Sequence, residues 1–219
     1  APLADGPVIQ SAANRSLKAG MSVEKAIMIV ADMRKKGLKI PVIIFTYYNL
    51  LLQLGRENFF ALMNENDVDG LLVPDLPFEE SAELRHQCES EQITYISLVA
   101  PTTSDERLRT IATNAKGFLY CVSSLGVTGE RQAFHPSVYA FLDKVNRFSS
   151  VPVVVGFGIS KREQIEELKS HCNGVVIGSA IVKQIGSRAA HLLDSELQQS
   201  AIDDIYQYVL SLFGRELVN

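Results

Sequence analysis

Two carboxylates occupy loop positions from which acid–base chemistry could be carried out. Asp5 lies in "LADGP", where Gly6 and Pro7 shape a turn, and Asp75 lies in "VPDLP", at the end of an apolar run. Two carboxyl groups that meet at one site can donate and accept protons during a reaction. The structural alternative is that aspartate before Gly-Pro forms a turn and that Asp75 caps a loop. Spacing alone leaves both interpretations open.

Glycines that follow two late apolar segments indicate a different property, the binding of an anion. In "VVVGFGIS" these are Gly156 and Gly158, and in "VVIGSAIV" Gly178 is followed by Ser179. Glycine lets backbone N–H groups approach a phosphate closely, and a helix that begins at Ser179 directs its positive end toward the same place. One such segment indicates only a tight turn, whereas two in succession predict a phosphate site.

The loop "SSLGVTGER" (123–131) places Gly126 and Gly129 on either side of Val127 and Thr128. Two glycines give a loop the freedom to close over a ligand. An ordinary connection between two elements has the same composition. The sequence therefore leaves a lid and a plain flexible loop as equal alternatives.

Aromatic side chains near the ends of two apolar segments predict a slot for a flat, apolar group. Phe45 and Tyr47 share one face of the first segment, and Phe118, Tyr120 and Val122 share one face of the other. At the mouth of a barrel, residues of this kind line a ligand pocket. Simple filling of the barrel interior is the alternative, and we adopt it for Phe118.

Strand and helix patterns alternate along the chain. Short apolar runs predict six strands, at 40–48, 70–75, 94–100, 117–123, 151–158 and 174–182. The run 40–48 is nearly continuous and rich in β-branched and aromatic residues, which predicts a strand buried on both faces. Helical periodicity predicts helices at 22–37, 57–66, 80–91, 105–115 and 137–148, followed by one with a Ser160–Glu163 capping box and by a last amphipathic helix. In the first of these helices, Ser22 is the expected N-cap and Gly37 the expected end.

This alternation implies a parallel sheet covered by helices. Six strands suffice for an open doubly wound sheet, whereas a closed (β/α)8 barrel needs eight. The Gly-x-Gly-x-x-Gly pattern of the open fold is absent after the early strands, and the glycine-rich strand ends are the last two, where barrels bind phosphate. We therefore expect an α/β fold of the TIM (β/α)8 barrel family, with about six βα units, as a single domain over 1–219.

Composition excludes several classes of function. The chain has 219 residues, of which 47% are hydrophobic and 21% charged, and its net charge of -4 provides no basic surface for nucleic acid. No apolar run approaches the roughly 18 residues that cross a bilayer. The three cysteines and four histidines lack the spacing of metal ligands. We expect a cytoplasmic protein with reduced cysteines, no metal and no membrane association.

Five segments together resemble the tryptophan synthase α subunit family, in the order and spacing of that family and over essentially the whole chain: "PLADGPVIQ", "LLVPDLPFEES", "FLYCVSSLGVTGER", "VVVGFGIS" and "GVVIGSAIVK". The resemblance implies a (β/α)8 barrel that cleaves indole-3-glycerol phosphate into indole and glyceraldehyde 3-phosphate. It also implies an α2β2 complex with a β subunit. Pyridoxal phosphate then belongs to that partner, so no cofactor is expected in this subunit.

The same resemblance assigns roles to individual residues. Asp5 corresponds to the catalytic aspartate that binds the indole N–H, Tyr120 to a tyrosine beside the glycerol and indole groups, and Thr128 to a lid threonine that engages the aspartate. The positions that correspond to the indole pocket are Phe45, Tyr47, Leu72, Pro74, Leu98, Val122, Phe157 and Val176. Those that correspond to the phosphate site are Gly129, Gly158, Gly178 and Ser179.

The family's reaction is a retro-aldol cleavage that passes through an indolenine tautomer. A carboxylate at the ring nitrogen stabilises the positive charge that develops there. A second carboxyl group must deliver a proton to C3 of indole and accept one from the glycerol hydroxyl. In the family this group is a glutamate on the second strand, shortly before the segment in which this chain begins. We therefore expect the first strand, first helix, second strand and this glutamate to be missing from an N-terminally truncated chain.

A smaller departure is Leu50 in "YYNLL", where many relatives have proline after the residue equivalent to Asn49, on the surface that faces the β subunit. The first hypothesis is a lyase subunit that is inactive alone, and two other functions stay open. One is a non-catalytic fragment that binds phosphate or indole, or self-associates through open sheet edges. The other is a different phosphate-binding barrel, against which the absence of a lysine at a strand end in 40–158 counts.

Overall fold

The computed structural model describes residues 5–122, 134–156 and 158–214. Its strands are β1 (Ile43–Phe45), β2 (Gly70–Leu72), β3 (Thr94–Tyr95), β4 (Ser97–Val99), β5 (Leu119–Val122), β6 (Val153–Gly156) and β7 (Gly174–Val176). Its helices are α1 (Pro7–Lys18), α2 (Val23–Lys35), α3 (Tyr48–Leu54), α4 (Arg56–Glu65), α5 (Ala82–Ser90), α6 (Asp105–Asn114), α7 (Pro136–Phe148), α8 (Arg162–Leu168), α9 (Ser179–Ser187), α10 (Ala189–Leu192) and α11 (Gln198–Phe213). The predicted alternation of strands and helices is confirmed.

All strand pairings within these ranges are parallel, in the orders β1-β2-β3 and β4-β5-β6-β7. The strand predicted at 94–100 is interrupted at Ile96, so that β3 pairs with β2 and β4 pairs with β5. The Ile96 N–H still donates to the Leu71 carbonyl at 2.9 Å, which keeps the bend attached to the first sheet. The described residues therefore hold six strand positions, as predicted, along one curved path.

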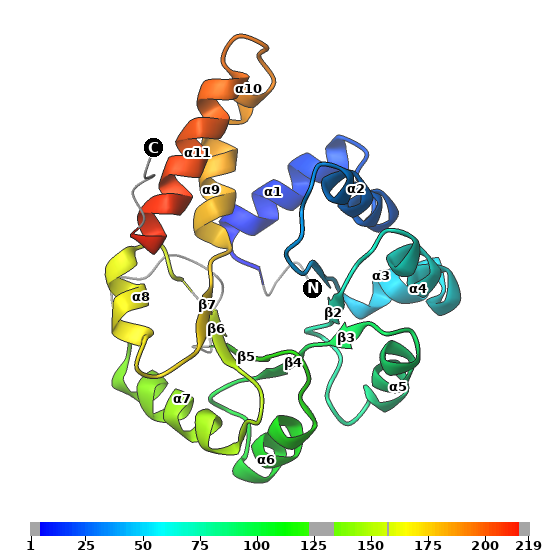
Figure 1. The fold of residues 1–219 in the computed structure, drawn as a ribbon, viewed down its shortest axis with the longest axis vertical. Coiled ribbons are helices and arrows are strands. Elements are labelled where there is room, and N and C mark those ends of the chain that lie inside the picture. The colour runs from blue at the N-terminus through cyan, green and yellow to red at the C-terminus, as the bar shows by residue number, and fades with distance from the viewer. Residues whose placement is uncertain (1–4, 123–133, 157, 215–219) are drawn as a thin grey trace.

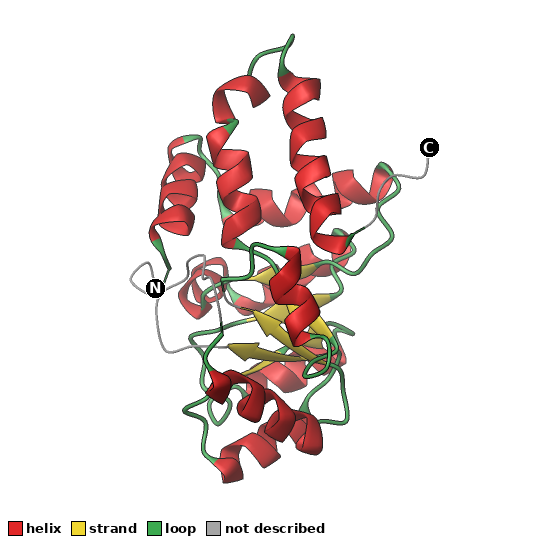
Figure 2. Ribbon diagram, turned by 90° about the vertical axis from the view of Figure 1, so that its left-hand side faces the viewer, coloured by secondary structure: helices red, strands yellow, loops and turns green. Residues whose placement is uncertain are grey.

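The strands form the middle of the molecule and the helices lie around them, which is the arrangement of a barrel wall (Figure 1). Helices α9 and α11 extend beyond this ring as a neighbouring pair (Figures 1 and 2). Within the described residues β1 and β7 each have one strand neighbour, so both are edge strands. None of the described helices has the length and apolar character needed to cross a membrane.

Side chains on the outward face of the strands form the hydrophobic core with the helices. Leu71 and Tyr95 pack with Phe59 and Phe60 of α4, while Cys121 packs in a second cluster built on β4–β6 and α6–α8. The prediction of a strand buried on both faces is wrong for β1, since Phe45 is 59% exposed. The reason is positional: β1 is an edge strand, so its inward face has no strand neighbour on one side among the described residues.

Two predicted strands are shorter than the sequence suggests, because helices begin inside the apolar runs. The run 40–48 ends as a strand at Phe45, and Tyr48 opens α3. The run 174–182 ends as a strand at Val176, and α9 begins at Ser179, where the glycine pattern placed a helix start. Helix α1 has no counterpart among the predicted elements, and none of its residues is buried.

Capping residues set the bounds of α2 as predicted. The Ser22 hydroxyl accepts a hydrogen bond from the Lys25 N–H at 3.3 Å, and Gly37 lies just beyond the helix with φ of +94°. The predicted capping box of Ser160 and Glu163 is wrong. The N-cap of α8 is Lys161, and its box partner is the buried Gln164, one residue later than expected.

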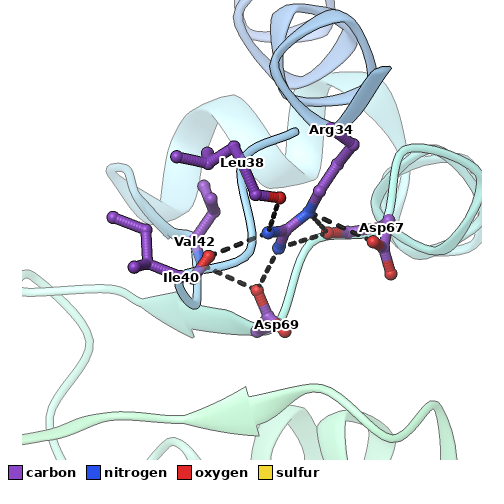
Figure 3. A network of polar contacts seen from close by, with 6 residues as sticks. All are labelled: Arg34, Leu38, Ile40, Val42, Asp67 and Asp69. Atoms are coloured by element: carbon purple, nitrogen blue, oxygen red, sulfur yellow. Dashed lines mark hydrogen bonds and ion pairs between the residues drawn. The ribbon is translucent and has the colours of Figure 1, made fainter. Parts of the chain in front are cut away.

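Arg34 at the end of α2 joins the segments that lead into β1 and β2 (Figure 3). Its guanidinium donates to the carbonyls of Leu38 and Ile40 at 3.1 and 2.8 Å and to the Asp69 carboxylate at 2.5 Å. It also donates to the Asp67 carbonyl. The same Asp69 carboxylate accepts the Val42 N–H at 2.6 Å. One cation thus fixes the starts of two neighbouring strands and, with them, their register.

Replacing Arg34 with methionine should lower the free energy of unfolding by about 2–3 kcal/mol, because several charge-assisted hydrogen bonds are lost from a side chain that is only 15% exposed. Lys35→Met is the matched control. Its ion pair with Asp32 is exposed on both sides, so the change should cost less than about 0.5 kcal/mol. Urea unfolding of both variants measures the difference, and equal costs would contradict the role assigned to Arg34.

Candidate active site

Asp5 reaches the end of β1 across 42 residues of chain. Its carboxylate accepts a hydrogen bond from the Tyr47 hydroxyl at 2.9 Å. Its carbonyl accepts one from the Gln10 side chain at 2.6 Å, one turn into α1. Gly6 and Pro7 form the N-cap and first residue of α1, so the turn predicted from "LADGP" leads directly into a helix. Asp5 is therefore oriented by two contacts and stays only partly buried.

Tyr47 lies among negative charges. Burial raises the pKa of its phenol to about 12, and the hydrogen bond to Asp5 and the charges of Asp5 and Asp75 act in the same direction. The phenol therefore keeps its proton throughout the physiological range. It serves as a hydrogen-bond donor that orients the Asp5 carboxylate.

Asp75 has the structural role that its position in "VPDLP" allowed. Both of its carboxylate oxygens accept the Tyr48 N–H, at 3.0 and 3.2 Å, at the first residue of α3. A carboxylate at a helix N-terminus satisfies a backbone donor and complements the helix dipole. Of the two loop carboxylates, Asp75 thus holds the helix that follows Tyr47, whereas Asp5 bonds the Tyr47 side chain.

The strand register places several predicted pocket residues on one face. Leu98 pairs with Tyr120, and Val122 pairs through Gly156 with Val176. Partners in a parallel pair point to the same side of the sheet, as do residues two apart. Leu98, Tyr120, Val122 and Val176 therefore share the inward face of β4–β7.

Strands β1 and β2 of the other sheet also carry predicted pocket residues. Phe45 pairs with Leu72, so these two side chains share a face of β1 and β2. Pro74 follows β2 by two residues and is partly buried. Leu72 is 3% exposed, yet it lies outside both clusters that pack against the helices, which agrees with an inward position.

Gly156 makes room for Tyr120, a role that the sequence did not reveal. A Cβ atom at Gly156 would overlap the Tyr120 hydroxyl and lie 2.7 Å from the ring carbon that bears it. The ring therefore crosses over β6 where that strand has no side chain. Burial raises the pKa of Tyr120. In the strand register Gly156 is opposite Val122, and Tyr120 lies two residues earlier on β5, opposite Val154. The sequence gives no signal for this diagonal contact, and the glycine pattern by itself indicates a phosphate site instead.

The glycine-rich strand ends combine a glycine in the left-handed conformation with an open helix start. Gly158 has φ of +70°, in the left-handed region, immediately before the buried Ile159. Gly178 is the N-cap of α9 and Ser179 its first residue. Within the described ranges, no hydrogen bond occupies the N–H of Gly158, Gly178 or Ser179. A Cβ atom at Gly178 would meet nothing within 4 Å, so the space before α9 is open.

Three predicted residues, Thr128, Gly129 and Phe157, lie outside the described residues, and with them the loop 123–131. Among the described residues, no three His, Cys, Asp or Glu side chains gather as ligands of a metal ion would.

Gly156→Ala should destabilise the fold by about 1–3 kcal/mol, because the added methyl group displaces the Tyr120 ring from the inward face. Gly174→Ala in β7 is the control, since its Cβ atom would make only an ordinary contact of 3.4 Å with Val154. Urea unfolding and the near-ultraviolet circular dichroism of tyrosine measure both effects. If the two variants behaved alike, the steric argument would be refuted.

Asp5→Asn should lower the pKa of Tyr47 from about 12 toward the ordinary value of 10.0, because a charged acceptor is lost while burial remains. The protonated phenol is favoured in the folded state, so the Tyr47–Asp5 bond persists at neutral pH and weakens as pH rises through that pKa. Ultraviolet titration of the phenols, with Tyr47→Phe as the reference for assignment, measures the shift. An unchanged value in Asp5→Asn would mean that the two groups do not interact.

Comparison with known proteins identifies the family. The model of the family "Tryptophan synthase alpha chain" matches residues 1–208. The chain is 58% identical over 211 residues to the tryptophan synthase alpha chain of Shouchella clausii, covering 96% of this chain and 78% of that protein. It is 53% identical over 213 residues to the one from Bacillus subtilis strain 168, covering 97% and 79%.

Solved structures agree with the sequence comparison. The fold is similar to a structure of the tryptophan synthase α2β2 complex from Pyrococcus furiosus, with a TM-score of 0.86 and 38% identity over 98% of this chain and 83% of that one. It is also similar to a mutant of the P. furiosus tryptophan synthase α-subunit, with a TM-score of 0.85 and 36% identity over 98% and 82%. The fold is therefore that of the TIM barrel family, and the chain belongs to the tryptophan synthase alpha chain family of lyases.

Proposed function

We propose that this chain binds indole-3-glycerol phosphate for retro-aldol cleavage to indole and glyceraldehyde 3-phosphate, a step of tryptophan biosynthesis. Membership of the family supports the reaction. The observation that carries the assignment of roles is the hydrogen bond from Tyr47, which orients the Asp5 carboxylate at the end of β1. Asp5 is then the acceptor for the indole N–H.

Asp5 would act by stabilising positive charge. As C3 of indole is protonated, charge develops on the ring nitrogen, and an oriented carboxylate next to it lowers the energy of that state. Tyr47 donates to one carboxylate oxygen, Oδ2, so that the carboxylate is fixed in direction before substrate arrives. The inward-facing Tyr120, for which Gly156 provides space, would lie beside the glycerol and ring groups.

The remaining roles divide between two ends of the ligand. Apolar and aromatic side chains would hold the indole ring: Phe45, Tyr47, Leu72, Pro74, Leu98, Val122 and Val176, together with Phe157 and Thr128. Backbone N–H groups of Gly158, Gly178 and Ser179 would bind the phosphate, with Gly129 from the loop 123–131. The open N-terminus of α9 supports this assignment, because its dipole favours an anion.

The second proton-transfer group is a glutamate in the family, and no acid among these 219 residues matches its position. We propose that these residues bind the substrate but do not turn it over by themselves. A purely non-catalytic module is the other candidate, and membership of a lyase family weighs against it.

We further propose that the partner is a tryptophan synthase β subunit in an α2β2 complex. The P. furiosus relative belongs to an α2β2 complex. Pyridoxal phosphate would belong to the β subunit, and this chain would need no cofactor, because proton transfer and charge stabilisation suffice for a retro-aldol step.

Release of glyceraldehyde 3-phosphate from indole-3-glycerol phosphate tests the proposal. The 219-residue chain should show negligible turnover, whereas a version extended by the preceding residues of the S. clausii relative should be active. In the extended version, Asp5→Asn should reduce turnover by at least about 100-fold, because the charge at the ring nitrogen is lost. Asp32→Asn, at an exposed position of α2, is the matched control and should have no effect.

Full turnover by the 219-residue chain would contradict the need for the second carboxyl group. Full turnover by the extended Asp5→Asn variant would contradict the role of Asp5. These two outcomes are independent, so the assay separates the reaction assigned to the family from the roles assigned to this chain's residues.

A further inference from the structure

The turn that follows β6 is held by side chains from two different helices. Ser160 lies two residues after Gly158, and both of its backbone polar groups are bonded to side chains of the protein. Ser160 is itself a small polar residue with no part in the predicted pocket. Its contacts therefore bear on the shape of the turn.

The first contact comes from α8. The Oε1 atom of Gln164 accepts the N–H of Ser160 at 2.9 Å and that of Lys161 at 3.0 Å. Gln164 is only 3% exposed, so this amide oxygen is withdrawn from water. A buried acceptor that takes two N–H groups fixes the direction of both peptide units.

The second contact comes from α11, 48 residues later in the chain. The Tyr208 hydroxyl donates to the Ser160 carbonyl at 3.0 Å. Helix α11 is anchored close by: Leu212 is 3% exposed, and a Cβ atom on Gly214 at its end would overlap the guanidinium of Arg162, the first residue of α8. The last helix thus lies against the start of α8 and reaches the turn from outside the barrel (Figure 1).

These contacts act on the backbone that would meet the phosphate. Between Gly158, with φ of +70°, and Ser160 stands only Ile159, whose side chain is 2% exposed in the core. Anchors on three successive residues, 159–161, restrain the peptide unit that joins Gly158 to Ile159 and so hold Gly158 in place. The Gly158 N–H is attached to this restrained unit through the backbone of Gly158 alone, so its position depends on groups that do not reach the ligand.

We propose that Tyr208 and Gln164 are positioning residues for phosphate: they hold the turn 158–161 so that the Gly158 N–H points at the phosphate group of the substrate. The inference rests on the proposed function and deepens it by adding α11 to the determinants of phosphate affinity. Neither side chain touches the ligand.

Titration of the 219-residue chain with glycerol 3-phosphate and, separately, with indole tests this inference, with dissociation constants from nuclear magnetic resonance. Tyr208→Phe removes a hydroxyl and keeps the ring. It should weaken glycerol 3-phosphate binding about three- to tenfold, the worth of one hydrogen bond. Indole binding should stay unchanged, since the pocket residues are untouched. Tyr206→Phe, on the same helix with a 48% exposed ring, is the matched control and should change neither.

Gln164→Leu supplies a second variant, which leaves two N–H groups without their acceptor and should weaken glycerol 3-phosphate binding more than Tyr208→Phe does. Equal binding by Tyr208→Phe and the unsubstituted chain would overturn the inference, as would parallel losses for glycerol 3-phosphate and indole, which indicate general loosening. If the unsubstituted chain showed no shifts at Gly158, Gly178 and Ser179 with glycerol 3-phosphate, the proposed function itself would fail.

Discussion

Parallel pairing of the strands is the constraint on which the rest of this molecule depends. When every strand runs in the same direction, all carboxyl ends meet at one edge, and the loops that follow them become neighbours. Asp75 and Gly158 lie just after the ends of β2 and β6, Tyr120 lies within β5, and the three are far apart in sequence. The registers are continuous within each sheet, and Ile96 joins one sheet to the next. A candidate site at this edge follows from topology before any side chain is considered.

The electrostatics of the site follow from where this edge places carboxylates. Asp5 and Asp75 both raise the pKa of Tyr47, yet of these two it is Asp5 that accepts its hydrogen bond. Asp75 is committed to the first N–H of α3. Asp75 therefore stabilises the start of a helix, whereas Asp5 is bonded to a tyrosine hydroxyl. Arg34 has a comparable structural role at the opposite ends of β1 and β2, where it fixes their starting points.

Two glycines have structural roles that depend on their lack of a side chain, for two different physical reasons. The Tyr120 ring occupies the space that a side chain at position 156 would need, so the role of Gly156 is steric. Gly158 has a φ of +70°, a conformation that other residues rarely adopt, so its role is to allow this backbone conformation. Both glycines belong to one short motif, "VVVGFGIS", and the letters alone do not distinguish the two purposes. Gln164 and Tyr208 act on the second of them from α8 and α11.

The sequence by itself determined what local physics controls: the alternation of elements, the cap at Ser22, the helix start at Ser179 and the family membership that motifs carry. It misjudged the length of the 40–48 strand and the partner in the α8 capping box, because a helix start and a buried amide depend on neighbours brought by the fold. Only the tertiary structure decided that Tyr47 bonds Asp5 and that Tyr208 bonds Ser160. These partners lie 42 and 48 residues apart in the sequence, so they meet only after the strands and helices between them have packed together. No local sequence pattern specifies which residues that packing brings into contact.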